Sequence, residues 1–349
     1  MARPATWGRA GRGGSSAIGP TTSWPGPRAP SSSTCSRRSA PTGTRRRSSA
    51  RPRRGGPRRE VGIVTLYKLR RQLPVLKEPA VVVALDGWVD AGSAATNAAS
   101  ILAHGGRVVA TFDADSIFDY RARRPTLEIV HGRPRSLEWP ELTIRASKVG
   151  EHDLLVFTGA EPDYRWHELS ADVAGLAVQL DVSQWISLGA IPAAVPHTRP
   201  VPILGTESRS GLLQGGVAPG PDGVLRVPSA AISIFDIAVA KAGIPSVGYF
   251  AQIPHYVSGE YPQASIDLLH ALGRHFDAEL DYGRLPEEAR LMRVRLDAAT
   301  AREETTKTYV ERLETLVDEA RLPSGDDLIS EIERFLREGG QQGGSGRLN

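Results

Sequence analysis

The stretch AVVVALDGWVDAGSAATNAASILAHGGRVVATF, residues 80–112, holds the pattern that decides the fold. It opens with the unbroken apolar run Ala80–Leu85, which is typical of a strand covered on both faces of a sheet. The small apolar residues at 91–104 then indicate a closely packed helix, and a pair of glycines ends it. Another apolar run at 107–112 indicates a second strand. The stretch therefore predicts a β-α-β unit.

The same alternation continues downstream of this unit. Strands are predicted at 63–69, 153–157, 184–191 and 246–253, and helices at 166–180, 232–242 and 261–276. Strands that alternate with helices at this spacing indicate a mainly parallel sheet with helices on both faces. Residues 126–149 differ, because their alternation favours an inserted antiparallel hairpin. We therefore expect the α/β fold class.

The composition changes after residue 284, where Glu, Arg, Leu and Ala dominate. Apolar residues then recur at the helical spacing i, i+3, i+4, namely Val310, Leu313, Leu316, Val317 and Ala320. Beyond Pro323, a last helix is predicted with the apolar face Leu328, Ile329, Ile332, Phe335 and Leu336. Two interpretations of the segment 284–338 stay open. It is either a lid packed on the chain's own core or an arm that contacts a partner or a sister subunit.

The predicted organisation has four parts: a tail at 1–60, an α/β core domain at 61–283, the helical segment at 284–338 and a second tail at 339–349. The first tail is rich in Arg, Pro, Gly and Ser and has little to bury, so we expect it to be disordered. The Gly-rich second tail is expected to be disordered as well. Three interpretations of the first tail stay open: an extension translated from upstream of the true start, a solvated linker or basic arm, and a targeting segment.

Charge is distributed unevenly between these parts. The tail at 1–60 contains 14 Arg, no Lys and one acid, a net charge of +13, whereas the whole chain carries +4, so residues 61–349 carry −9. An acidic core repels phosphate backbones, and a nucleic-acid partner is therefore not expected. No apolar run approaches the roughly 20 residues that span a bilayer, and no secretory signal is visible. We expect a cytoplasmic protein without a membrane partner.

The common catalytic signatures are missing from the sequence. There is no phosphate-binding G-x-x-x-x-G-K-[ST] loop, no G-x-G-x-x-G after a strand, no G-x-S-x-G elbow and no H-E-x-x-H zinc motif. The single cysteine, Cys35, lies in the first tail, so the core has neither a thiol nucleophile nor a cysteine-type zinc site. We therefore predict no cofactor and no metal, and the sequence favours a protein that is not an enzyme without deciding the question.

Polar side chains gather where the predicted strands end, which is the edge at which doubly wound sheets bind ligands. These candidates for a ligand or interface cleft are Asp86, Asp90, Glu161, Trp166, His197, Arg199, His255 and Tyr256. Several also have a purely structural interpretation: Asp90 can cap a helix, Trp166 can fill the core, and Arg199 can pair with Glu161 or Glu207. If the loops converge, carboxylate, imidazole and guanidinium groups would line one cleft suited to an anionic ligand or to acid–base chemistry.

Four segments together resemble a known family. They are LDGWVDAGSAA at 85–95, DLLVFTGAEPDYRWH at 153–167, LGAIPAAVPHTRPV at 188–201 and GIPSVGYFAQIPHYVSGEYPQASI at 243–266. With the closing DLISEIERFL at 327–336, the set resembles the actinobacterial branch of the proteasome assembly chaperone 2 family, over residues 62–338. Each motif is short, and the specificity of the match lies in their order and spacing.

The resemblance implies a three-layer α/β/α sandwich with a phosphorylase/hydrolase-like core, a C-terminal helical extension, and homo-oligomers. Eukaryotic members of the family are non-catalytic chaperones that help proteasome α-rings to assemble. The predicted function is therefore a non-catalytic, oligomeric protein-binding protein of the proteasome-assembly type, with itself and proteasome subunits as partners. Some bacterial members are labelled ATP-grasp or carboxylate–amine ligase enzymes, so the alternative is a small-ligand-binding protein or ligase-like enzyme that uses the strand-end cleft.

Overall fold

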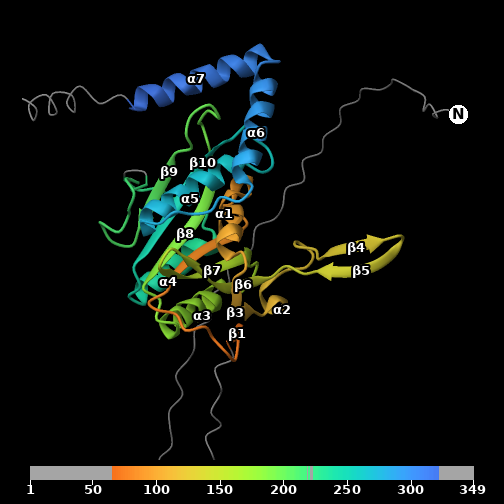
Figure 1. Cartoon of the computed structure of the whole chain (residues 1–349), viewed down its shortest axis with the longest axis vertical. Helices are drawn as coiled ribbons and strands as arrows, with labels where there is room; N and C mark the ends of the chain where they lie inside the picture. Colours follow the sequence, from red (N-terminus) through yellow and green to blue (C-terminus); the bar gives the residue numbers. More distant parts are fainter. Residues whose placement is uncertain (1–64, 218, 221–222, 322–349) are drawn as a thin grey trace, which may run out of the picture. The chain divides into compact units, whose positions relative to one another are not determined.

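The computed structural model describes residues 65–217, 219–220 and 223–321 (Figure 1). The predicted tails at 1–60 and 339–349 and the predicted helix beyond Pro323 lie outside the described residues, and the domain boundaries stay predictions. Within the described ranges, no helix is both long enough and apolar enough to cross a lipid bilayer.

The described residues form one eight-stranded sheet with the strand order β1-β3-β6-β7-β2-β8-β10-β9. The strands are β1 (Tyr67–Leu69), β2 (Ala80–Asp86), β3 (Arg107–Phe112), β6 (Leu142–Val149), β7 (His152–Ala160), β8 (Gln184–Ala193), β9 (Ile203–Glu207) and β10 (Ser246–Pro254). The central strands β7, β2, β8 and β10 pair in parallel, whereas the pairs β1–β3, β3–β6, β6–β7 and β9–β10 are antiparallel. The parallel centre follows from the β-α-β order predicted from the sequence.

Helices cover both faces of the sheet and complete three layers (Figure 1). They are η1 (Ala91–Ser93), α1 (Ala94–Ala103), α2 (Ala114–Ile117), α3 (Trp166–Gln179), α4 (Ala231–Lys241), α5 (Pro262–Phe276), α6 (Leu285–Thr300) and α7 (Glu304–Arg321). The side chains of β2 alternate between two cores: Val82 and Ala84 pack with α1 and α5, and Val81 and Val83 pack with α3 and α4. The predicted α/β sandwich with helices after the core is confirmed.

Three elements depart from the sequence prediction in detail. The region 126–149 contains a separate hairpin, β4 (Thr126–Val130) with β5 (Arg133–Glu138), while β6 joins the main sheet. Strand β9 was not predicted, because its five residues contain glycine and follow a proline, and its pairing with β10 supplies the missing stabilisation. The predicted helical segment that begins at residue 284 contains two helices, α6 and α7, separated at residues 301–303, and the apolar run from Val310 lies within α7. We refer to α6 and α7 together as the helical arm.

Candidate functional site

Strands β2 and β7 lie side by side in parallel, and the chain leaves them toward opposite faces of the sheet. The helix that follows β2 is α1, which packs with α5, whereas α3 follows β7 and packs with α4. Such a reversal is the point at which doubly wound proteins open a ligand crevice at the carboxyl edge of the sheet. The polar residues Asp86 and Glu161 follow the two strands at this switch point.

The carboxylate of Glu161 lies at the switch point and bonds to the backbone on both sides of it. One oxygen accepts a hydrogen bond from the backbone N–H of Trp88 at 2.9 Å, and the other accepts one from the N–H of Ala231 at 2.7 Å. Because Ala231 is the first residue of α4, this carboxylate sits at a helix N-terminus, where a bound anion would be stabilised. A Cβ at Gly87 would overlap the Glu161 side chain, so glycine is required there. The chain's own carboxylate therefore takes the place of an anionic ligand.

The remaining charges at the switch point form a loose cluster around Arg123. Its guanidinium lies 3.7 Å from an Asp86 oxygen and 3.9 Å from an Asp163 oxygen, and its buried Nε atom makes no hydrogen bond. The second Asp163 oxygen accepts a hydrogen bond from the backbone N–H of Asp119 at 2.8 Å. Since the Asp86 side chain is 74% exposed, solvent screens its pairing with Arg123.

Asp90 and Trp166 have structural roles at this edge. The Asp90 carboxylate accepts hydrogen bonds from the N–H groups of Ala95 and Thr96, so it caps α1 as expected from the sequence, although the helix begins only after η1. Burial raises the pKa of Asp90, and these hydrogen bonds oppose the rise. The indole of Trp166 is half-buried against the core and donates to the carbonyl oxygen of Pro162 at 2.6 Å.

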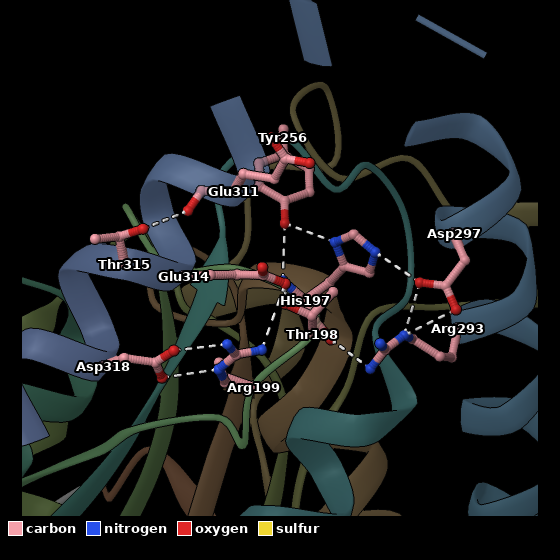
Figure 2. Close-up of polar contacts among 10 residues, drawn as sticks. All are labelled: His197, Thr198, Arg199, Tyr256, Arg293, Asp297, Glu311, Glu314, Thr315 and Asp318. Atoms are coloured by element: carbon pink, nitrogen blue, oxygen red, sulfur yellow. Dashed lines mark hydrogen bonds and ion pairs between the residues drawn. The ribbon is translucent and has the colours of Figure 1, made fainter. Parts of the chain in front are cut away.

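A second cluster lies where β8 and β10 end, and the helical arm covers it (Figure 2). The backbone N–H of His197 donates to the Tyr256 hydroxyl oxygen at 2.8 Å, and the His197 Nδ1 atom lies 2.8 Å from the same oxygen. On the other side of the ring, Nε2 lies 3.1 Å from a carboxylate oxygen of Asp297 on α6. Arg293 donates to Asp297 and to the carbonyl oxygen of His197, which closes the network.

Burial favours the neutral form of the His197 ring. Desolvation lowers its pKa below the ordinary value, and the hydrogen bond to Asp297 opposes this shift. A neutral ring carries one proton, and the nearby carboxylate favours its position on Nε2. Nδ1 is then an acceptor, and the Tyr256 hydroxyl donates to it. Both ring nitrogens of His197 therefore have a hydrogen-bond partner within the chain.

The two residues after His197 bind the second helix of the arm (Figure 2). The Thr198 hydroxyl donates to Glu314, and the Arg199 guanidinium donates twice to Asp318, at 2.9 and 2.7 Å. Arg199 also lies 3.4 Å from Glu314. The suggested pairing of Arg199 with Glu161 or Glu207 is wrong, because the carboxylates of α7 cover the loop first.

His255 completes the contact between core and arm. Its Nδ1 atom lies 3.1 Å from the carbonyl oxygen of Ala193, and its Nε2 atom lies 3.4 Å from the hydroxyl of Tyr309 on α7. The rings of Tyr256 and Tyr309 also meet edge to face. We call the residues that join the 197–199 loop and the strand end to the arm the loop–arm cluster: His197, Thr198, Arg199, His255, Tyr256, Arg293, Asp297, Tyr309, Glu314 and Asp318.

The contacts divide the predicted site residues into two sets. His197, Arg199, His255 and Tyr256 meet in the loop–arm cluster, whereas Asp86, Asp90, Glu161 and Trp166 lie at the edge with the switch point. Within the described ranges, no side-chain hydrogen bond or ion pair joins the two sets. Sequence reasoning missed Arg123 and the carboxylates of the arm. The spacing i, i+4 of Glu314 and Asp318, which places both on one face of a helix, is the signal that could have indicated them. Among the described residues, no group of three or more His, Cys, Asp and Glu side chains is arranged to hold a metal ion.

Replacing Arg199 with alanine is expected to loosen α7 and leave the sheet unchanged. The Arg199 side chain is 30% exposed and solvent screens its ion pairs, so we expect a modest effect, roughly fivefold faster amide hydrogen exchange in α7. The control Arg290→Ala removes an exposed ion pair with Glu287 on α6 and should leave that exchange unchanged. Equal exchange in the two variants would mean that the apolar contacts of Val310 and Leu313 hold α7 alone.

Comparison with known proteins assigns the chain to a protein family. The model of the PAC2 family matches residues 84–300. Comparison with curated protein sequences gives no match. The matched region includes both strand-end clusters except for the part of the loop–arm cluster that α7 contributes.

Solved structures agree with this match. A Corynebacterium glutamicum protein of unknown function is 30% identical, with a TM-score of 0.68 over 72% of this chain and 97% of the other. A Mycobacterium tuberculosis proteasome-assembly chaperone homologue is 30% identical, with a TM-score of 0.61 over 66% of this chain and 99% of the other. A PAC2 family protein from Streptomyces avermitilis is 32% identical, with a TM-score of 0.59 and the same coverage. The chain belongs to the PAC2 family.

Proposed function

We propose that this chain is a non-catalytic, homo-oligomeric protein-binding protein of the proteasome-assembly-chaperone type that acts in the cytoplasm. The observation that carries the proposal is the state of the strand-end edge. Glu161 occupies the switch point, and the loop–arm cluster pairs His197 and Arg199 with carboxylates of the same chain. Reactive groups that are already paired hold loops in place, which suits a rigid binding surface.

The relatives support the same function. The Mycobacterium tuberculosis protein described as a proteasome-assembly chaperone homologue is 30% identical to this chain and is covered almost completely by it. We extend that description to this chain as a proposal, with proteasome subunits as its partner class.

The hairpin β4–β5 supports the homo-oligomeric part of the proposal. Leu127 and Leu137 are directly opposite each other, and Ile129 continues the same face, on which all three side chains are about half exposed. The other face is polar, with Ser136 donating to Glu128. A two-stranded hairpin without a third strand is only marginally stable in water, so a second copy of the chain that covers the apolar face would stabilise it.

The test measures the molar mass of the protein in solution and its binding to a partner. The full-length protein is expected to form an oligomer in light scattering, and immobilised oligomer is expected to capture purified proteasome α-subunits of the source organism. Ile129→Lys should shift the oligomer toward the monomer, whereas Thr126→Lys, on the polar face of the hairpin, should not. A monomeric wild-type protein would overturn the oligomer, and an oligomer that captures no α-subunit would overturn the proteasome partner.

A further inference from the structure

A cavity of about 390 Å³ lies between α5, α6 and the loop that carries His197. Its volume falls within the range of pockets that hold small molecules. The apolar part of its wall is formed by Pro200, Ala289, Met292 and Leu296, and its polar part by Thr198, Tyr261, Gln263, Asp267 and Arg293, with His197 and Arg199 at the loop. The cavity therefore joins the core to the first helix of the arm, away from the switch point that Glu161 fills.

Tyr261 is the first sign that this cavity is built for a ligand. The residue is only 3% exposed, yet its hydroxyl makes no hydrogen bond to any described residue. Burial raises the pKa of this phenol, and the charges of Arg293 and Asp267, which also line the cavity, act on it. Because Tyr261 lines the cavity and its hydroxyl has no partner among the described residues, that hydroxyl is free to bond a group inside the cavity.

Asp267 is the second sign. Its side chain is 19% exposed, accepts hydrogen bonds from the Gln263 amide at 3.0 Å and from the backbone N–H of Val201, and lies 3.7 Å from the His270 ring. Desolvation raises the pKa of this carboxyl group. No Lys or Arg within the described ranges forms an ion pair with it. A partly buried carboxylate that has only a histidine as its basic neighbour gains from pairing with a positively charged ligand.

Arg293 offers the complementary charge at the same cavity. It uses Nε toward Asp297 and Nη1 toward the carbonyl oxygen of His197, which leaves Nη2 without a partner among the described residues. A ligand carboxylate could accept from this nitrogen and from the Tyr261 hydroxyl. Met292 and Leu296 provide an apolar wall in the same cavity.

We propose that this cavity binds an aliphatic α-amino acid. The ammonium group pairs with Asp267, the carboxylate accepts hydrogen bonds from Tyr261 and Arg293, and the side chain packs against Ala289, Met292 and Leu296. Since Asp267 lies on α5 and Arg293 on α6, the bound amino acid ties the helical arm to the core.

Three compounds of similar size test whether the cavity binds both the ammonium group and the carboxylate of the ligand. Titration calorimetry on the full-length protein is expected to show one L-leucine bound per chain. Isopentylamine, which lacks the carboxylate, and 4-methylpentanoate, which lacks the amine, should each bind at least tenfold more weakly, since each leaves one charged group of the cavity unpaired. Absence of L-leucine binding, or equal affinity for either analogue, overturns the proposal without any variant.

Variants then locate the site. Tyr261→Phe and Asp267→Asn should each weaken L-leucine roughly tenfold, whereas Glu279→Gln, which neutralises an exposed carboxylate outside the cavity, should not. Hydrogen exchange of α6 in the wild-type protein should slow when L-leucine is added. Unchanged affinity in both cavity variants would place the amino acid elsewhere and contradict the assignment.

Discussion

Replacing Gly159 with alanine is expected to prevent stable folding. Gly159 lies in β7 beside β2 and β6, with φ at +143°, a backbone conformation that is essentially restricted to glycine. A Cβ there would overlap the backbone carbonyl of Glu141, which belongs to the neighbouring chain segment and cannot move aside as a side chain would. We expect a loss of more than about 4 kcal/mol, a large part of the stability of a typical domain.

The control is a second glycine in the same α/β unit. Gly175 is exposed within α3, and a Cβ there would meet no atom within 4 Å, so Gly175→Ala should stabilise the protein by about 0.5–1 kcal/mol. Soluble yield and thermal unfolding of the two variants measure the contrast. A Gly159→Ala protein as stable as wild type would show that the backbone near Glu141, where β6 begins beside the end of β7, can shift. The strand ends would then not form the rigid surface on which the proposed function depends.

Replacing Asp236 with asparagine is expected to stabilise the protein above pH 7. Asp236, on α4, is partly buried and accepts hydrogen bonds from the Ser187 hydroxyl and from the Trp185 indole, the latter at 2.9 Å. Desolvation raises its pKa from 3.8 to about 7, and the two hydrogen bonds only partly oppose that rise. Asparagine keeps an acceptor oxygen for both donors and cannot ionise.

The direction of the pH dependence follows from the raised pKa. The unfolded carboxyl group loses its proton near pH 3.8, whereas the folded one keeps it up to about pH 7, so the stabilisation is complete below pH 3.8 and is lost as the pH rises to 7. The full loss corresponds to about 4 kcal/mol. Because the new amide N–H replaces the carboxyl oxygen to which no described residue donates, we allow a cost of about 1–3 kcal/mol and expect Asp236→Asn to be about 2 kcal/mol more stable than wild type at pH 8.

Denaturant unfolding at several pH values between 4 and 8 measures this difference. It should grow with pH and level off above pH 7, while Asp281→Asn, an exposed control, should give no trend. A difference that does not change with pH would show that Asp236 titrates at its ordinary pKa, and that its site is more hydrated than the structure indicates.

The two strand-end clusters explain why the chain keeps so many polar residues without a catalytic motif. Glu161 stabilises the start of α4, and the loop–arm cluster adds polar contacts between α7 and the core to the buried apolar contacts of Val310 and Leu313. An arm attached by exposed ion pairs is held less firmly than one attached by a large apolar interface. The amino-acid cavity, next to the same loop, would add a ligand-dependent contact between core and arm.

The sequence by itself determined the fold class and the order of most strands and helices of the α/β core. The apolar run in β2 and the small residues of α1 form local patterns, because the period of apolar residues within one segment sets its conformation and the faces it buries. The positions of the candidate polar residues at strand ends followed from the same local reasoning.

Only the tertiary structure decided which of those residues meet. Glu161 binds Ala231, 70 positions away, and Arg199 binds Asp318, 119 positions away. These pairs depend on the strand order β7-β2-β8-β10 and on which helix covers each strand end. The periodicity of apolar residues within one segment encodes neither the strand order nor the position of the covering helix. The same reason explains Tyr261 and Asp267, whose sequence neighbours give no sign of a cavity, because its opposite wall comes from a different helix.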